Sequence, residues 1–219
     1  MSRWGDPQIV AGFSRSEPNA TLMRFVEGER ARTQRPSVLD LGCGAGRNAV
    51  PMAALGCRVL GTDVERPMLE AAARRAQAQG VASRTLWALA PMDRLPAPGR
   101  AFDVIVAHGI WNLARSSGEF RRGVAEAARA ARAGAGLFVF TFSRHTLAPD
   151  AEPVAGEPFV FTQFSGEPQC FLTEAELLSE LAAAGFSPLG PLAEHNLPLP
   201  GQLNRGGPVI YEGTFRLRS

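Results

Sequence analysis

The chain has 219 residues, 45% of them hydrophobic, and a formal net charge of +2. This length and apolar content are typical of a single α/β domain with a sizeable core. The arginines are scattered without a run of like charges, so the sequence does not indicate a nucleic-acid partner. All 23 basic residues are arginine, which excludes a lysine Schiff base.

Cysteine and histidine spacing gives no sign of a metal site. The three cysteines, Cys43, Cys57 and Cys170, form no CxxC pair, and the three histidines lack helical ligand spacing. We expect the cysteines to be buried, reduced thiols. The first residues contain no apolar signal-peptide core, and no stretch approaches the ~18 apolar residues of a membrane span. The sequence therefore predicts a cytoplasmic protein without a membrane partner.

Short apolar runs alternate with alanine-rich segments through the middle of the chain. The runs are continuously apolar, which is typical of parallel strands covered on both faces. The predicted strands are 37–42, 57–63, 84–89, 102–109 and 136–142, and the predicted helices between them are 46–55, 66–79 and 117–132. This order predicts an α/β fold, a doubly wound and mostly parallel sheet with helices on both faces.

Both ends of the chain add elements to this core. A helix is expected over 17–31, where Leu22, Phe25 and Val26 have helical spacing. Residues 143–171 are rich in proline, glycine and aromatic residues and predict an excursion after the fifth strand. A capping box predicts a helix over 172–186, and a last strand is expected near 209–217. With no linker, we predict one domain over 1–219.

The stretch "VLDLGCGAGRNAV" at 38–50 places Gly42, Gly44 and Gly46 between the first strand and the next helix, predicted to start near Arg47. In open α/β sheets, ligands bind outside the carboxyl ends of the strands, next to this turn. Glycine allows unusual φ/ψ values and leaves room for a ligand against the main chain. We therefore expect an adenosine-containing ligand to lie over the turn.

Spacing and charge distinguish between two such ligands. A dinucleotide fingerprint requires G-x-G-x-x-G, but Arg47 stands where its third glycine would fall. Asp40, two residues before the first glycine, would repel a pyrophosphate but attract the ammonium group of S-adenosylmethionine (SAM), directly or through water. Asp63 ends the second predicted strand, where a carboxylate can accept hydrogen bonds from both ribose hydroxyls. The glycine spacing, Asp40 and Asp63 therefore favour SAM over a dinucleotide.

The stretch from Val38 to Ala72 resembles the first motif and following strand of the class I SAM-dependent methyltransferases, and the similarity extends over roughly 36–142. This resemblance implies a Rossmann-like, seven-stranded sheet whose last strand is inserted antiparallel. It also implies that Val64 and Ala107 contact the cofactor. "GRNA" at 46–49 is similar to the tellurite-resistance and thiopurine-type branch, whose acceptors are small molecules.

The resemblance is incomplete at the adenine site. Many relatives have an aspartate followed by a small residue where this chain has Pro91 and Met92. Two alternatives stay open for binding the adenine amino group, the Asp93 side chain or backbone groups of Met92.

The acceptor pocket is expected between the N-terminal segment 1–35, which would form a helical lid, the loop 108–112 and the excursion 143–171. His145, just after the fifth strand, is a candidate general base, and Arg144 is a candidate ligand for an anionic acceptor. His108 is an alternative contact for cofactor or acceptor. Six aromatic residues are candidates to wall the pocket, with core packing as the alternative at each of them: Trp4, Phe13, Trp111, Phe159, Phe161 and Phe164.

The sequence thus predicts methyl transfer from SAM to a small-molecule nucleophile by in-line displacement, a reaction that requires mainly alignment and desolvation. Three alternatives stay open: a non-catalytic SAM-binding module, an NAD-dependent oxidoreductase, and a methyltransferase acting on macromolecules. The sequence identifies neither the acceptor nor the oligomeric state.

Overall fold

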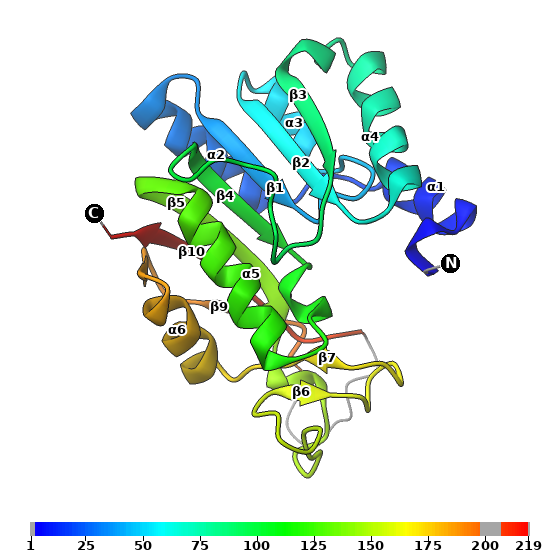
Figure 1. Cartoon of the computed structure of the whole chain (residues 1–219), viewed down its shortest axis with the longest axis vertical. Helices are drawn as coiled ribbons and strands as arrows, with labels where there is room; N and C mark the ends of the chain where they lie inside the picture. Colours follow the sequence, from blue (N-terminus) through cyan, green and yellow to red (C-terminus); the bar gives the residue numbers. More distant parts are fainter. Residues whose placement is uncertain (1–2, 198–206, 219) are drawn as a thin grey trace.

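A mixed β-sheet forms the centre of the computed structural model, which describes residues 3–197 and 207–218 (Figure 1). Its strand order is β3-β2-β1-β4-β5-β10-β8, with β9 also paired to β10. The strands are β1 (Ser37–Leu41), β2 (Arg58–Asp63), β3 (Thr85–Leu89), β4 (Phe102–His108), β5 (Ala131–Phe142), β8 (Phe186–Pro188), β9 (Ala193–His195) and β10 (Ile210–Leu217). The five predicted core strands and the predicted last strand are confirmed, although β5 begins earlier than expected.

The last strand has the inserted, antiparallel position that the family resemblance implies. β10 lies between β5 and β8 and runs antiparallel to both, while β1 to β5 pair in parallel. The sheet contains eight strands rather than seven, because two short strands share one edge of β10. β8 pairs with 215–217 and β9 with 210–212.

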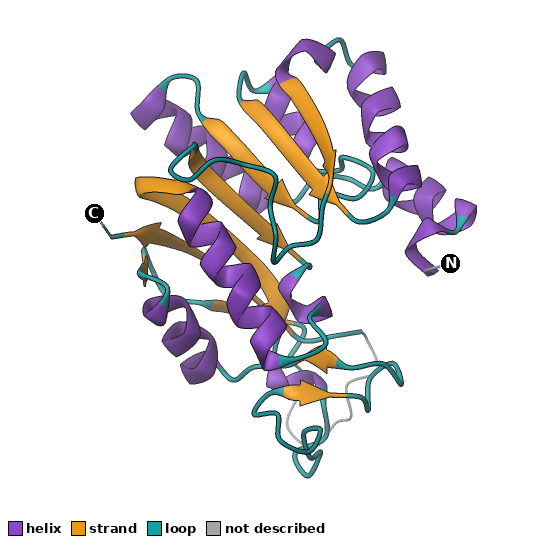
Figure 2. Ribbon diagram, in the orientation of Figure 1, coloured by secondary structure: helices purple, strands orange, loops and turns teal. Residues whose placement is uncertain are grey.

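Helices cover both faces of the sheet (Figure 2). One face carries α2 (Ala20–Thr33), α3 (Ala49–Ala54) and α4 (Arg66–Ala78), and the other carries α5 (Ser117–Ala130) and α6 (Glu174–Ala183). These apolar faces form two core clusters, one on each side of the sheet, as expected for a doubly wound fold. A further helix, α1 (Pro7–Arg15), precedes the helix predicted over 17–31, within the segment 1–35 that was expected to be helical, and contacts α4. No helix in the described ranges is long and apolar enough to cross a lipid bilayer.

The helix expected from residue 46 starts later. Residues 42–48 form turns, and α3 begins only at Ala49, because Gly46 has a φ of +75° that a right-handed helix cannot accommodate. By contrast, α6 begins with the predicted capping box between Thr173 and Glu176. The excursion 143–171 contains a short 3-10 turn (Arg144–Thr146) and a two-stranded sheet of β6 (Val160–Phe161) and β7 (Gln169–Cys170), beyond the end of β5 (Figure 1).

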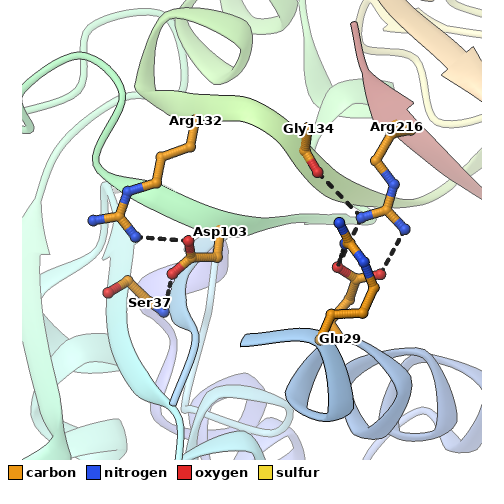
Figure 3. Close-up of polar contacts among 7 residues, drawn as sticks. Glu29, Ser37, Asp103, Arg132, Gly134 and Arg216 are labelled. Atoms are coloured by element: carbon orange, nitrogen blue, oxygen red, sulfur yellow. Dashed lines mark hydrogen bonds and ion pairs between the residues drawn. The ribbon is translucent and has the colours of Figure 1, made fainter. Parts of the chain in front are cut away.

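At the amino end of the sheet, charged side chains tie helix and strands together (Figure 3). Glu29 of α2 is buried and accepts hydrogen bonds from Arg216 at 2.7 and 2.8 Å and from Arg32 at 2.6 Å. Nearby, Asp103 accepts from the Ser37 backbone at 2.8 Å and from Arg132 at 2.6 Å. Every carboxylate oxygen of these two residues therefore has a donor.

Candidate active site

A cleft opens at the carboxyl ends of β1, β2 and β4. This position is the usual ligand site of an open α/β sheet. The lining residues come from the N-terminal segment, the glycine turn and the residues that follow β2, β3 and β4: Trp4, Phe13, Gly42, Gly44, Asp63, Val64, Glu65, Met68, Ala90, Met92, His108, Gly109, Ile110 and Leu113.

The three glycines of the turn have left-handed φ values of +61°, +52° and +75°, but different surroundings. A Cβ on Gly42 would lie 2.6 Å from Ile110, and one on Gly46 would lie 3.1 Å from Ala72, so both positions require close packing. A Cβ on Gly44 would meet nothing nearer than Phe13 at 3.6 Å. Since Gly44 lines the cleft, its missing side chain leaves space for a ligand.

Asp63 joins the end of β2 to the glycine turn. Its Oδ2 accepts from the Gly44 backbone at 2.9 Å and its Oδ1 from the Glu65 backbone at 2.9 Å. Burial raises the pKa of Asp63, and these backbone hydrogen bonds oppose the shift. Because each carboxylate oxygen can accept a second hydrogen bond, Asp63 fixes the turn and can still bind hydroxyl groups in the cleft.

Asp40 lies behind the lining of the cleft and is only 2% exposed. Its Oδ2 has no hydrogen-bond partner among the described residues. Burial raises the pKa of Asp40 to about 7, nearby Arg47 opposes this shift, and Asp63 adds to it. A buried carboxylate oxygen without a donor is unfavourable, so this position is suited to a cationic or hydrogen-bond-donating ligand group.

A polar junction connects Arg47, across the carboxyl end of β4, to β10. Arg47 Nη2 lies 3.1 Å from His108 Nδ1 and 3.2 Å from Nε2, over the ring, and Asn19 Nδ2 lies 3.3 Å from Nε2. Asn19 Nδ2 also donates to Glu212 of β10 at 2.8 Å. The His108 ring stacks on Phe140 at 4.1 Å, and burial, followed by the charge of Arg47, lowers its pKa to about 3. His108 is therefore a neutral imidazole at the wall of the cleft.

Sequence reasoning missed most of this junction. It considered His108 but assigned no role to Asn19 or Glu212, and it treated Arg47 only as a missing glycine. The proline and asparagine before α2 are a helix-start signal that marks Asn19 as an N-cap. No local signal identifies Glu212, because its partner Asn19 is 193 residues away in the sequence.

The predicted adenine-side residues divide into two groups. Val64 and Met92 line the cleft, as does Ala90. Asp93 does not: its carboxylate forms an ion pair with Arg122 of α5 at 3.0 Å. Ala107 is buried in the core cluster beside α5, and its neighbours 108–110 reach the cleft instead. Of the two adenine alternatives, the geometry favours Met92 over Asp93.

The two predicted catalytic residues lie outside the lining of the cleft. The Arg144 guanidinium donates to the carbonyls of Ala148, Pro149 and Ala151 and stacks over Phe161 at 4.9 Å. These contacts already use the guanidinium that was expected to bind an anionic acceptor. His145 Nδ1 is 2.7 Å from Glu194, so only its Nε2 is left for a substrate.

The predicted aromatic wall is only partly formed. Trp4 and Phe13 line the cleft and contact each other edge to face, with ring centroids 6.0 Å apart. Trp111, Phe159 and Phe161 are buried in the main core cluster and cannot wall a cavity. Phe164 is 43% exposed and packs on Phe142 and Phe171. The aromatic character of the three buried residues therefore serves core packing rather than substrate contact.

A second cavity adjoins the first, since Trp4 and Leu113 line both. Its other walls come from the start of α5 and from the excursion: Arg115, Ser165, Glu167, Pro168 and Gln169. Residues of the N-terminal segment and of the excursion thus both line this cavity, and its use by an acceptor stays a prediction.

Comparison with known proteins agrees with this geometry. Residues 38–134 match the family model described as a methyltransferase domain. The chain is 30% identical over 190 residues to a ubiquinone biosynthesis O-methyltransferase of Caulobacter vibrioides, covering 84% of this chain and 73% of that protein. The chain belongs to the class I SAM-dependent methyltransferases.

Other relatives of this methyltransferase agree in family and fold. A ubiquinone biosynthesis O-methyltransferase of Azorhizobium caulinodans is 28% identical over 203 residues, covering 84% of this chain and 76% of its own. The structure of Burkholderia thailandensis 1,6-didemethyltoxoflavin-N1-methyltransferase, solved with S-adenosylhomocysteine, has a TM-score of 0.67 at 21% identity, covering 91% of this chain and 79% of that one. The cofactor of this methyltransferase is SAM, and its reaction is methyl transfer to a small molecule.

Proposed function

We propose that this methyltransferase methylates a hydroxyl oxygen of a small molecule, and that the glycine turn, Asp40 and Asp63 hold its SAM. The observation that carries the cofactor assignment is the pairing of an open cradle at Gly44 with an unpartnered buried oxygen on Asp40. A nucleoside next to Gly44 and a cation near Asp40 together match SAM, whereas a dinucleotide brings negative charge to this position.

The adenosine half of SAM would occupy the β2 side of the cleft. Asp63 is proposed to accept hydrogen bonds from the ribose hydroxyls, with Val64 and Met92 on either side of the adenine. Gly42 and Gly46 would act indirectly, by keeping the turn in its left-handed shape. We assign Asp93 and Ala107 no direct contact, because the first is paired with Arg122 and the second is buried in the core.

The amino-acid half of SAM carries an ammonium and a carboxylate group. Asp40 and Arg47 offer the matching pair of charges behind the glycine turn, and each shifts the pKa of the other in the direction expected for opposite neighbours. We propose that Asp40 attracts the ammonium, directly or through water, and that Arg47 attracts the carboxylate. A dinucleotide has no such zwitterion.

When bound, SAM supplies a methyl group already activated on a sulfonium. The protein then has to align an acceptor oxygen and exclude water. Trp4 and Phe13, from the segment 1–35, are proposed to cover the cleft as a lid, and the second cavity beside 143–171 is proposed to admit the acceptor. His145, whose Nδ1 is held by Glu194, is the proposed base for the hydroxyl proton, and because it lines neither cavity the acceptor hydroxyl would have to reach its Nε2 beyond the lining. Arg144 is proposed to support the excursion.

An oxygen acceptor is supported by the names of the two relatives above, which are O-methyltransferases of ubiquinone biosynthesis. We also infer a cytoplasmic location, supported by three buried, free cysteines.

A methyl-transfer screen tests the acceptor. The protein is incubated with tritiated SAM and matched sets of phenols, catechols, thiols, amines and metalloid oxyanions. We expect label on the hydroxyl compounds, and label confined to sulfur, nitrogen or metalloid acceptors would overturn the oxygen assignment. The cofactor residues are tested separately by calorimetric titration of SAM and NAD, where heat from SAM alone is expected.

A further inference from the structure

Asn19, the N-cap of α2, contacts four different parts of the fold. Its Oδ1 accepts from the Leu22 backbone at 2.9 Å, within its own helix. Its backbone N–H donates to Asn48 at 3.0 Å, in the glycine turn. Its Nδ2 donates to Glu212 of β10 at 2.8 Å and lies 3.3 Å from His108 Nε2 at the end of β4.

Helix capping alone does not explain an asparagine here. Aspartate and serine cap helices about as well, because the cap requires only a side-chain acceptor. Asparagine also brings an NH2 group with two hydrogens. Since Oδ1 is bound to the Leu22 N–H, the orientation of the amide is determined, and both hydrogens point toward Glu212 and His108.

This orientation determines the state of the His108 ring. Nε2 accepts from Asn19, so the ring hydrogen is on Nδ1 and the imidazole is neutral. Arg47 Nη2 lies 3.1 Å from Nδ1 and 3.2 Å from Nε2, a position over the face of the ring rather than at the lone pair of either nitrogen. A neutral ring can hold a guanidinium on its face, whereas an imidazolium repels it. The Asn19 amide separates the ring from the buried Glu212.

We propose that Asn19 is a positioning residue of the cofactor site: it keeps His108 as a neutral ring against which the Arg47 guanidinium lies, and so directs Arg47 toward the amino-acid end of SAM. Without the amide, the Glu212 carboxylate would favour a protonated imidazole, and that cation would repel Arg47. This inference rests on the proposed contact between Arg47 and the SAM carboxylate. It also explains why the start of α2 is joined to the glycine turn and to β10 at one residue.

Two substitutions that keep the helix cap test the proposal, Asn19→Asp and Asn19→Ser. We measure binding of SAM and of 5′-methylthioadenosine, which retains adenine, ribose and sulfur but has no carboxylate. SAM affinity should fall about tenfold, the equivalent of one hydrogen bond to a charged group, while 5′-methylthioadenosine affinity stays unchanged. Ser116→Ala, which removes the N-cap of α5, is the matched control and should leave both affinities as they are.

The outcomes separate this inference from the proposed function. If Arg47→Gln does not weaken SAM binding, the carboxylate contact itself is wrong. If Arg47→Gln weakens it but neither Asn19 variant does, only the positioning role is overturned. An equal loss of both ligands in the Asn19 variants would indicate a purely structural role and would also overturn it.

The ring state gives an independent measurement. In ¹⁵N-histidine NMR spectra, His108 of the parent protein should be neutral with its hydrogen on Nδ1. In Asn19→Asp, the hydrogen should move to Nε2 or the ring should become protonated, because the new carboxylate can only accept. A parent ring with its hydrogen on Nε2, or a ring state unchanged by Asn19→Asp, would contradict the proposal.

Discussion

Carboxylates at the two ends of the sheet differ in whether their oxygens have hydrogen-bond donors. At the amino end, both oxygens of Glu29 and both of Asp103 have donors (Figure 3). Ion pairs join α2 to β10 and β4 to β5, and a backbone hydrogen bond joins β1 to β4. At the carboxyl end, Asp40 keeps an oxygen without a partner and Asp63 binds only backbone groups. Carboxylates whose oxygens all have donors stabilise the fold, whereas a buried carboxylate oxygen without a donor marks where a ligand completes the site.

The largest effect should be a loss of stability from a substitution at the amino end of the sheet. Glu29→Ala leaves the Arg216 guanidinium without its buried partner, and breaking such a pair destabilises a protein by about 3 to 5 kcal/mol. Urea denaturation would measure this loss. SAM affinity of the folded variant should equal that of the parent, because the pair lies at the far end of the sheet from the cleft. A loss below about 1 kcal/mol would show that this pair behaves like an exposed one.

Gly44→Ala should give the next largest effect, a loss of SAM affinity. The added methyl group would enter the ligand space, and SAM affinity should drop about 100-fold, the upper end of an overpacking penalty. Gly80→Ala is the control, because Gly80 has a similar φ of +67° but nothing within 4 Å and lies away from the cleft. The control should lose stability only. Equal SAM affinity in the two variants would remove Gly44 from the site.

Asp63→Ala should weaken SAM binding by about 2 kcal/mol, roughly thirtyfold, since charge-assisted hydrogen bonds to the ribose are lost. Calorimetric titration would measure the affinity. Asp103→Ala is the counterpart at the amino end, where the carboxylate also accepts from a backbone N–H. It should destabilise the fold without changing SAM affinity. If both variants bind SAM equally, Asp63 serves only to shape the glycine turn.

The comparison also explains what the sequence could reveal. The strands, the glycine turn and the two aspartates are local features, because strand, turn and helix follow one another within a few residues. The Glu29–Arg216 pair joins residues 187 apart, and Asn19 meets Glu212 across 193 residues. Only the insertion of β10 beside β5 brings these partners together, and no local pattern encodes that register. For a related reason, the sequence left pocket wall and core as alternatives for Trp111 and Phe159, because an aromatic residue in a loop sequence does not indicate whether the loop folds into the core. The structure buries both.

Asp40, at the carboxyl end, should make the free energy of unfolding depend on pH. Burial raises its folded pKa from 3.8 to about 7, so the folded protein binds this proton more tightly than the unfolded chain. The contribution of Asp40 to stability should therefore fall as pH rises from about 4 to about 7, by at most about 1.4 kcal/mol per pH unit, and change no further above that.

SAM binding should show the reverse trend. A cationic group near Asp40 favours the ionised form, so SAM affinity should rise by up to about tenfold per pH unit toward pH 7 and then level off. Asp40→Asn should remove both dependences and bind SAM more weakly at pH 8 than the parent. A parent affinity that is flat between pH 5.5 and 8 would mean that Asp40 does not contact the cofactor cation. Opposite pH trends in stability and binding are what a carboxylate retained for its ligand, at the expense of the fold, should produce.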